Sequence, residues 1–254
     1  MSVTAHTWAL NRPAPHHTAS EDAAFSLPAA AEGVWWAAVA DGVGSAPGGR
    51  LASAAVVAAT ELWTRQGPPG RGRLDALFRA AALRLADLER SDAGLRGLAT
   101  TLTVLGLAAD AVWVAHMGDC RLYRANRAGV CRLTADHRLE PDGQPFLTRA
   151  VTAAGIHRPD VARLPAPEPG ELLLLCTDGV WSAAEPGALE SALLLGAERT
   201  ARFLLDLAER RRDDFCCVLL NLGPGTANRE PFAGGCARGR SPTRPLDPEG
   251  GGAP

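Results

Sequence analysis

The sequence lacks the cysteine pattern of a zinc protein. It contains six cysteines, but none forms a C-x-x-C pair and no histidine stands at zinc-ligand spacing from them. Cys176, Cys216 and Cys217 lie in apolar runs, where we interpret them as small buried side chains. A cysteine-ligated zinc site is therefore excluded, and unpaired thiols of this kind suit a reducing cytosol.

The sequence also has no long apolar run and no strong charge. No apolar stretch reaches about 18 residues without a charge or a turn signal, and residues 1–13 have neither the basic nor the apolar region of a signal peptide. We therefore expect a cytoplasmic, monomeric protein with no membrane association. The net charge of −2 gives no electrostatic reason to expect nucleic-acid binding.

What the chain does have is enough apolar material for one large domain. It has 254 residues, of which 46% are hydrophobic. From residue 223 onward the composition changes to Gly, Pro, Arg and Ser with almost no apolar content. We therefore predict a folded domain over residues 1–222 and a disordered tail over 223–254.

Apolar periodicity predicts an alternation of strands and helices. The helical patterns cover residues 50–66, 74–90, 187–195 and 198–211, and the strand-like runs cover residues 34–40, 100–107, 111–117, 120–124, 130–133, 171–177 and 215–222. The short connections in the central series indicate antiparallel pairing. The expected fold class is α+β: a four-layer α-β-β-α sandwich, with two antiparallel sheets inside and helices outside.

Four short acidic patches are spread over almost 200 residues, at 20–22, 40–44, 176–179 and 212–214. The last three each stand at one end of an apolar run, where a strand should meet a loop. Taken singly, they have ordinary explanations: an Asp-Gly turn, a helix N-cap pair or a surface charge run. Brought together, the carboxylates would repel one another unless cations held them, which is the composition of an all-oxygen site for Mg²⁺ or Mn²⁺.

The joint order of these patches resembles a known family. Eight short segments between residues 20 and 220 match, in family order, the protein phosphatase 2C-like family of metal-dependent Ser/Thr phosphatases, bacterial type with a shortened flap. They are Ser20-Glu21-Asp22, Val39-Ala40-Asp41-Gly42-Val43-Gly44, Ala99-Thr100-Thr101, His116-Met117-Gly118-Asp119-Cys120-Arg121, Leu133-Thr134-Ala135-Asp136-His137, Leu147-Thr148-Arg149-Ala150-Val151, Leu174-Leu175-Cys176-Thr177-Asp178-Gly179-Val180-Trp181 and Asp213-Asp214-Phe215-Cys216-Cys217-Val218. The family's fold is the same α-β-β-α sandwich.

The resemblance implies roles for individual residues. Asp41 would bridge two Mn²⁺ or Mg²⁺ ions, one of which is also held by Glu21 and the Gly42 carbonyl. The other ion would be held by Asp178 and Asp213. Asp22 would hold water bound to the ions, so Asp41, Asp178 and Asp22 form the expected catalytic set. Asp119, with Asp178, matches a position for a third, weaker ion.

Three departures from the family pattern accompany this resemblance. Where the family has a phosphate-gripping Arg, this chain has Thr18 or His17, and His16 or His17 is the candidate substitute. Where some relatives have a His that protonates the leaving group, this chain has Val43. Only nine residues separate His137 from Leu147, where the family normally carries a flap subdomain. An open site that admits a bulky protein substrate is the consequence.

The expected function is hydrolysis of phosphoserine and phosphothreonine in a protein substrate, opposing a cognate bacterial Ser/Thr kinase. No Cys-x5-Arg loop is present, so a cysteine-nucleophile phosphatase is excluded. Two alternatives remain open at the level of sequence. One is a pseudo-phosphatase that binds phosphoproteins without turnover, and the other is a phosphatase for small phosphoesters.

Overall fold

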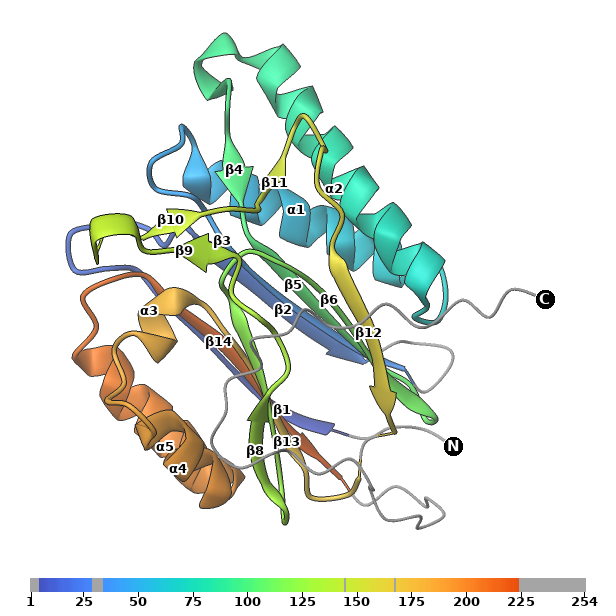
Figure 1. Ribbon diagram of the computed structural model, residues 1–254, viewed down its shortest axis with the longest axis vertical. Helices are drawn as coiled ribbons and strands as arrows, with labels where there is room; N and C mark the ends of the chain where they lie inside the picture. The colour runs from blue at the N-terminus through green and yellow to red at the C-terminus, as the bar shows by residue number, and fades with distance from the viewer. Residues whose placement is uncertain (1–4, 29–33, 144, 167, 224–254) are drawn as a thin grey trace.

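The computed structural model describes residues 5–28, 34–143, 145–166 and 168–223, and its described part contains two five-stranded antiparallel sheets packed face to face (Figure 1). In the order of pairing, the first sheet consists of β1 (Ala5–Arg12), β14 (Phe215–Leu222), β13 (Leu172–Cys176), β7 (Arg121–Asn126) and β8 (Gly129–Arg132). The second consists of β12 (Asp160–Pro165), β6 (Ala111–Met117), β5 (Leu102–Leu107), β3 (Trp35–Asp41) and β2 (Asp22–Pro28). The predicted tail, apart from Gly223, lies outside the described residues.

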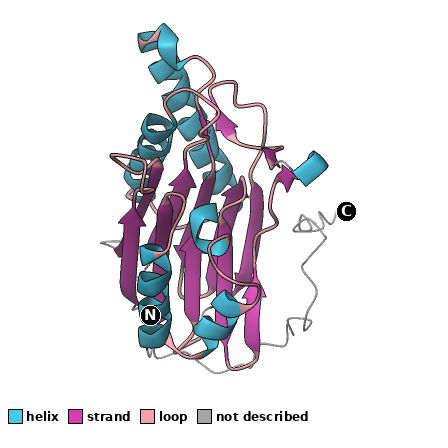
Figure 2. Cartoon of the chain, turned by 90° about the vertical axis from the view of Figure 1, so that its left-hand side faces the viewer, coloured by secondary structure: helices cyan, strands magenta, loops and turns pink. Residues whose placement is uncertain are grey.

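Helices cover the outer face of each sheet (Figures 1 and 2). The second sheet carries α1 (Gly49–Thr64) and α2 (Arg71–Ser91). The first carries α4 (Ala188–Leu194) and α5 (Ala197–Glu209), with the short α3 (Asp178–Trp181) at its end. The predicted α-β-β-α sandwich of two antiparallel sheets is confirmed.

Three apolar clusters fill the spaces between the four layers. The middle one joins the two sheets, and the outer two join each sheet to its helices. Strand β3 shows why its sequence is apolar without interruption: Trp36 and Ala38 face the helices, whereas Ala37 and Val39 face the other sheet. A strand buried on both faces has no solvent side on which to place polar residues.

Several predicted boundaries were wrong in detail. Strands β1, β2 and β12 had not been predicted from the sequence, and α2 begins at Arg71 rather than at residue 74. Asp178 does not lie in a loop but opens helix α3, two residues after β13 ends. No helix in the described part of the chain is both long enough and apolar enough to cross a membrane.

Smaller elements border the end of the sandwich where the acidic residues gather. Strand β4 (Ala99–Thr100) pairs with β11 (Val151–Thr152), and β9 (Arg138–Leu139) pairs with β10 (Phe146–Leu147). Two 3₁₀ turns, Ala93–Leu95 and Pro141–Gly143, lie in the connections.

Candidate active site

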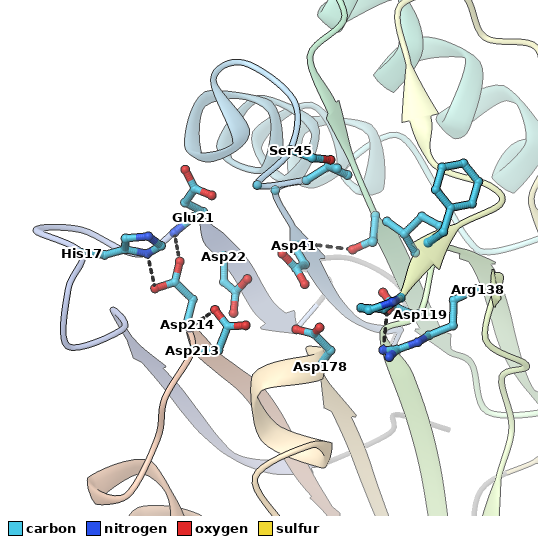
Figure 3. A pocket seen from close by; sticks show the side chains of 17 residues that line it. His17, Glu21, Asp22, Asp41, Ser45, Asp119, Arg138, Asp178, Asp213 and Asp214 are labelled. Carbon is cyan, nitrogen blue, oxygen red and sulfur yellow. Dashed lines mark hydrogen bonds and ion pairs between the residues drawn. The ribbon is translucent and has the colours of Figure 1, made fainter. Parts of the chain in front are cut away.

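Acidic residues from both sheets line one pocket of about 460 Å³ (Figure 3). All seven residues to which the resemblance gives a metal-binding or catalytic role lie in its wall: Glu21, Asp22, Asp41, Gly42, Asp119, Asp178 and Asp213. The other lining residues are His17, Val43, Gly44, Ser45, Thr101, Arg138, Pro145, Phe146, Leu147 and Asp214. Patches separated by up to about 190 positions of sequence thus share one space.

Strand pairing places the first two carboxylates side by side. Asp22 begins β2, Asp41 ends β3, and the two residues are direct partners in the antiparallel register. Directly opposed residues project from the same face of a sheet. The backbone of Asp41 is fixed on both sides by Thr101, whose hydroxyl accepts from the Asp41 N–H at 2.9 Å and whose own N–H donates to the Asp41 carbonyl at 2.8 Å.

Glycine at position 42 is required by close packing against helix α1. A Cβ atom on Gly42 would lie 2.3 Å from the carbonyl carbon of Gly49, which no side chain can tolerate. A Cβ on Gly49 would lie 3.1 Å from Oε2 of Glu21. The first turn of α1 therefore rests on the Asp-Gly turn, and the Glu21 carboxylate lies beside the positive end of the helix dipole.

The other half of the pocket comes from the first sheet. Thr177, between β13 and α3, donates from its hydroxyl to Oδ2 of Asp22 at 2.7 Å and so joins the two sheets. Asp178 follows at the first position of α3. A Cβ on Gly179 would lie 1.8 Å from the Asp214 carbonyl oxygen, so glycine there lets α3 approach the loop that carries Asp213.

Asp214, which is 5% exposed, is an anchor that sequence reasoning did not assign. Its Oδ1 accepts from the Ala14 N–H at 2.5 Å and lies 3.1 Å from Nδ1 of His17. Its Oδ2 accepts from the Glu21 N–H at 2.6 Å. The hydrogen bond to Asp214 raises the pKa of His17 above its usual value. His17 therefore lies at the pocket wall with its Nδ1 engaged, whereas Thr18 is not among the lining residues.

Burial and mutual repulsion disfavour the charged forms of several carboxyl groups. Burial raises the pKa of Asp22 to about 8, and the nearby Asp178 and Asp214 add to the effect. Burial, with repulsion from Asp22 and Asp178, raises the pKa of Asp41 well above its ordinary value. Burial also raises the pKa of Asp178 above its ordinary value, and it raises the pKa of Asp119 to about 6. Without cations the pocket therefore favours protonated carboxyl groups, because the surrounding protein does not compensate their negative charge.

Arg138 is a pocket residue that sequence reasoning missed. Its Nη1 lies 3.3 Å from Oδ2 of Asp119, and its Nη2 lies 2.6 Å from Oε1 of Glu140. Its guanidinium carbon is 5.0 Å from the centre of the Trp181 ring, and the indole N–H of Trp181 donates to the Asp119 carbonyl at 3.1 Å. Its position directly after His137, at the start of the shortened flap, was the available sequence signal.

The donor set fits hard divalent cations by its chemistry. The candidate ligands are carboxylate and carbonyl oxygens alone, and Glu21, Asp22, Asp41, Asp178 and Asp213 surround the same space (Figure 3). In the described residues, no three Asp, Glu, His or Cys side chains converge tightly enough to enclose one ion by themselves. Water molecules and substrate oxygens would complete the coordination, as is usual for Mg²⁺.

The comparison with known proteins agrees with this arrangement. A family model described as protein phosphatase 2C matches residues 16–213. The chain belongs to the protein phosphatase 2C family. That match extends from the His16-His17 pair to Asp213, so it includes every candidate site residue named from the sequence.

Individual members of the family are similar over part of their length. A probable protein phosphatase 2C 74 of rice is 29% identical over 211 residues, and the Ser/Thr protein phosphatase PstP of Mycobacterium tuberculosis is 28% identical over 192. Each alignment covers 68% of this chain, but only 53% and 37% of those two proteins. The chain thus spans about half or less of the length of these relatives.

Solved structures of PstP share the fold. The M. tuberculosis structure superposes with a TM-score of 0.74 at 24% identity, covering 87% of this chain and 99% of PstP's crystallised chain. The PstP catalytic domain in complex with two manganese ions gives 0.72 at 23% identity, covering 87% and 100%. These likenesses support the fold assignment.

Proposed function

We propose that this protein phosphatase 2C family member is a metal-dependent phosphoprotein phosphatase that hydrolyses phosphoserine and phosphothreonine. The observation that carries the proposal is the convergence of carboxylates from both sheets in one pocket, where burial and repulsion leave negative charge uncompensated. Divalent cations would supply that compensation. The relatives named as Ser/Thr phosphatases, and the two manganese ions in PstP, support the same assignment.

We propose that this pocket would hold two Mn²⁺ or Mg²⁺ ions. Asp41 would serve both ions, Glu21 and the Gly42 carbonyl would serve one, and Asp178 and Asp213 would serve the other. Such a pair of ions lowers the pKa of bound water and neutralises charge on a phosphoryl group. A third, weaker ion at Asp119 would have to share that carboxylate with the Arg138 guanidinium.

The chain's own residues position the reactants. Asp22 lies beside Asp41, and the Thr177 hydroxyl donates to its Oδ2, which fixes the orientation of the Asp22 carboxyl group in the pocket. His17 and Arg138 are the two residues lining the pocket that can carry positive charge, so they are the candidates for contact with the substrate phosphate. Because positioning and charge carry this chemistry, no covalent intermediate is needed.

The proposed domain bounds, oligomeric state, location and partner are those expected from the sequence. We propose a monomeric catalytic domain over residues 1–222 that acts in the cytoplasm on the substrates of a cognate Ser/Thr kinase. The short connection between His137 and Leu147 has no room for a flap subdomain, so a bulky protein substrate can approach the pocket.

Phosphate release from a phosphothreonine peptide tests the proposal. Purified protein should turn over the peptide with added Mn²⁺ or Mg²⁺ and lose activity with a chelator. Undiminished activity after exhaustive chelation would rule out the metal mechanism. Peptide binding without turnover would instead indicate a pseudo-phosphatase, and preference for small phosphate esters in competition would indicate a metabolite phosphatase.

A further inference from the structure

The hairpin of β9 and β10 forms one wall of the pocket and is firmly anchored at its root. His137, just before β9, donates its N–H to the Gly118 carbonyl and accepts from the Thr148 N–H with its own carbonyl, both at 2.8 Å. Its Nε2 lies 2.9 Å from Oδ2 of Asp160, which also pairs with Arg149 at 2.8 Å. The root is therefore fixed to the turn that carries the pocket residue at position 119.

Apolar side chains stand exposed on this anchored hairpin. Leu139 is 60% exposed and Phe146 is 64% exposed, and the two are direct partners in the strand register. Phe146 and Leu147 also line the pocket. Apolar surface beside a strongly acidic pocket adds little to stability, because it stays in contact with water. It is available for contact with another molecule.

Arg138, next to Leu139 on β9, makes two ion pairs that an anion in the pocket could replace. Its pair with Glu140 involves a carboxylate that is 60% exposed, so this pair is weak and exchangeable. Its contact with Asp119 is long, at 3.3 Å, and its side chain, which is 17% exposed, lines the pocket, so its Nη atoms can exchange a carboxylate for a phosphate oxygen. A phosphate monoester carries between one and two negative charges near neutral pH and accepts paired hydrogen bonds from guanidinium.

We propose that the β9–β10 hairpin is the substrate-recognition wall of this phosphatase. Arg138 binds a phosphate oxygen of the substrate, and Phe146, supported by Leu139, packs against an apolar side chain adjacent to the phosphorylated residue. The substrate class is therefore a phosphoserine or phosphothreonine flanked by an apolar residue. This inference rests on the proposed function, and it gives the shortened flap a role in selectivity.

Two phosphothreonine peptides test the apolar contact. They differ only in carrying Leu or Ser on both sides of the phosphothreonine. With Mn²⁺, wild type should prefer the Leu peptide by about tenfold in kcat/KM, and Phe146→Ala should abolish most of this preference. Ile156→Ala is the matched control, because Ile156 is 74% exposed and does not line the pocket. Equal preference in wild type and Phe146→Ala would overturn the proposal.

The phosphate contact has its own test. Arg138→Ala should raise KM for both peptides about tenfold, with a smaller change in kcat, and Arg138→Lys should recover part of the loss. The control is Arg163→Ala, because Arg163 is half-exposed on β12 and pairs with Asp110 outside the pocket. A fall in kcat at unchanged KM would show that Arg138 only supports Asp119, and would overturn its assignment to phosphate.

Peptide binding separates this inference from the proposed function. Fluorescence anisotropy with a labelled Leu peptide, compared with its unphosphorylated form, reports recognition whether or not the protein turns over substrate. Binding that depends on Phe146 and Arg138 in a protein without turnover would preserve the recognition wall and reject the phosphatase. Turnover that depends on neither Phe146 nor Arg138 would support the phosphatase activity and reject the role of the hairpin in substrate recognition.

Discussion

The metal-free protein should lose stability as the pH rises from 5 to 8. Burial raises the pKa of Asp22 from 3.8 to about 8, so folding favours the protonated form. The stability linked to a raised pKa is fully present below the ordinary value and is lost as the pH rises through the folded-state value. The raised pKa of His17 acts in the same direction.

The size of the effect can be estimated from Asp22 alone. One pKa unit corresponds to about 1.4 kcal/mol, so the whole shift is worth up to ~6 kcal/mol, of which ~3.5 kcal/mol falls between pH 5 and pH 8. For a chain of this size that is a fall in Tm on the order of 10 °C. Asp41 shifts in the same sense, but its titration is coupled to that of Asp22, so the two effects do not add.

Thermal melting in chelator at several pH values measures this fall. Added Mn²⁺ should raise Tm more at pH 8 than at pH 5, because the ion binds the ionised carboxylates. Asp22→Asn should flatten the pH profile, whereas Asp206→Asn, which changes an exposed residue of α5, should leave it unchanged. Asp160, whose pKa is lowered to about 2 by His137 and Arg149, titrates below this window. A chelated protein whose Tm stays level or rises from pH 5 to pH 8 would refute the reasoning.

Three further predictions concern the pocket. Asp41→Asn and Asp178→Asn should each lower kcat at least about 100-fold in steady-state assays with Mn²⁺, and circular dichroism should show that both variants keep their fold. Near wild-type rates would show that these residues are not metal ligands. Gly42→Ala should lower Tm by several degrees, since its Cβ would lie 2.3 Å from the Gly49 backbone, and an unchanged melting curve would contradict this. His17→Arg should lower KM for a phosphopeptide about threefold with little change in kcat, because guanidinium offers paired donors; a raised KM would count against a phosphate-binding role at this position.

The sequence was informative where strands are buried on both faces. Strands β3, β13 and β14 were predicted because sheets covered by helices leave no side for polar residues. Strands β1 and β12 escaped prediction because exposed polar side chains interrupt their apolar pattern. Edge strands of this kind are recognised from their pairing partner rather than from composition.

The candidate carboxylates could be named in advance because a strand followed by Asp-Gly is a local pattern. Arg138 and Asp214 could not be assigned in this way, since their roles depend on contacts across the fold. Arg138 meets Asp119 only because the β9–β10 hairpin is anchored to the Gly118 turn. Asp214 meets Ala14 and His17 only because the end of β1 pairs with the start of β14 at Arg12 and Phe215.

The neighbouring residues Asp213 and Asp214 show how the fold gives different roles to two identical side chains. Both carboxylates line the pocket, and the sequence alone gives them the same chemistry. Asp214 has both oxygens engaged by contacts to Ala14, His17 and Glu21, so it has little capacity left for a cation. Asp213 accepts one hydrogen bond, from the Asp214 N–H to Oδ1 at 2.8 Å. Its remaining lone pairs can therefore face an ion, while Asp214 fixes the Glu21 backbone beside it, so the adjacent carboxylates divide ligation and positioning between them.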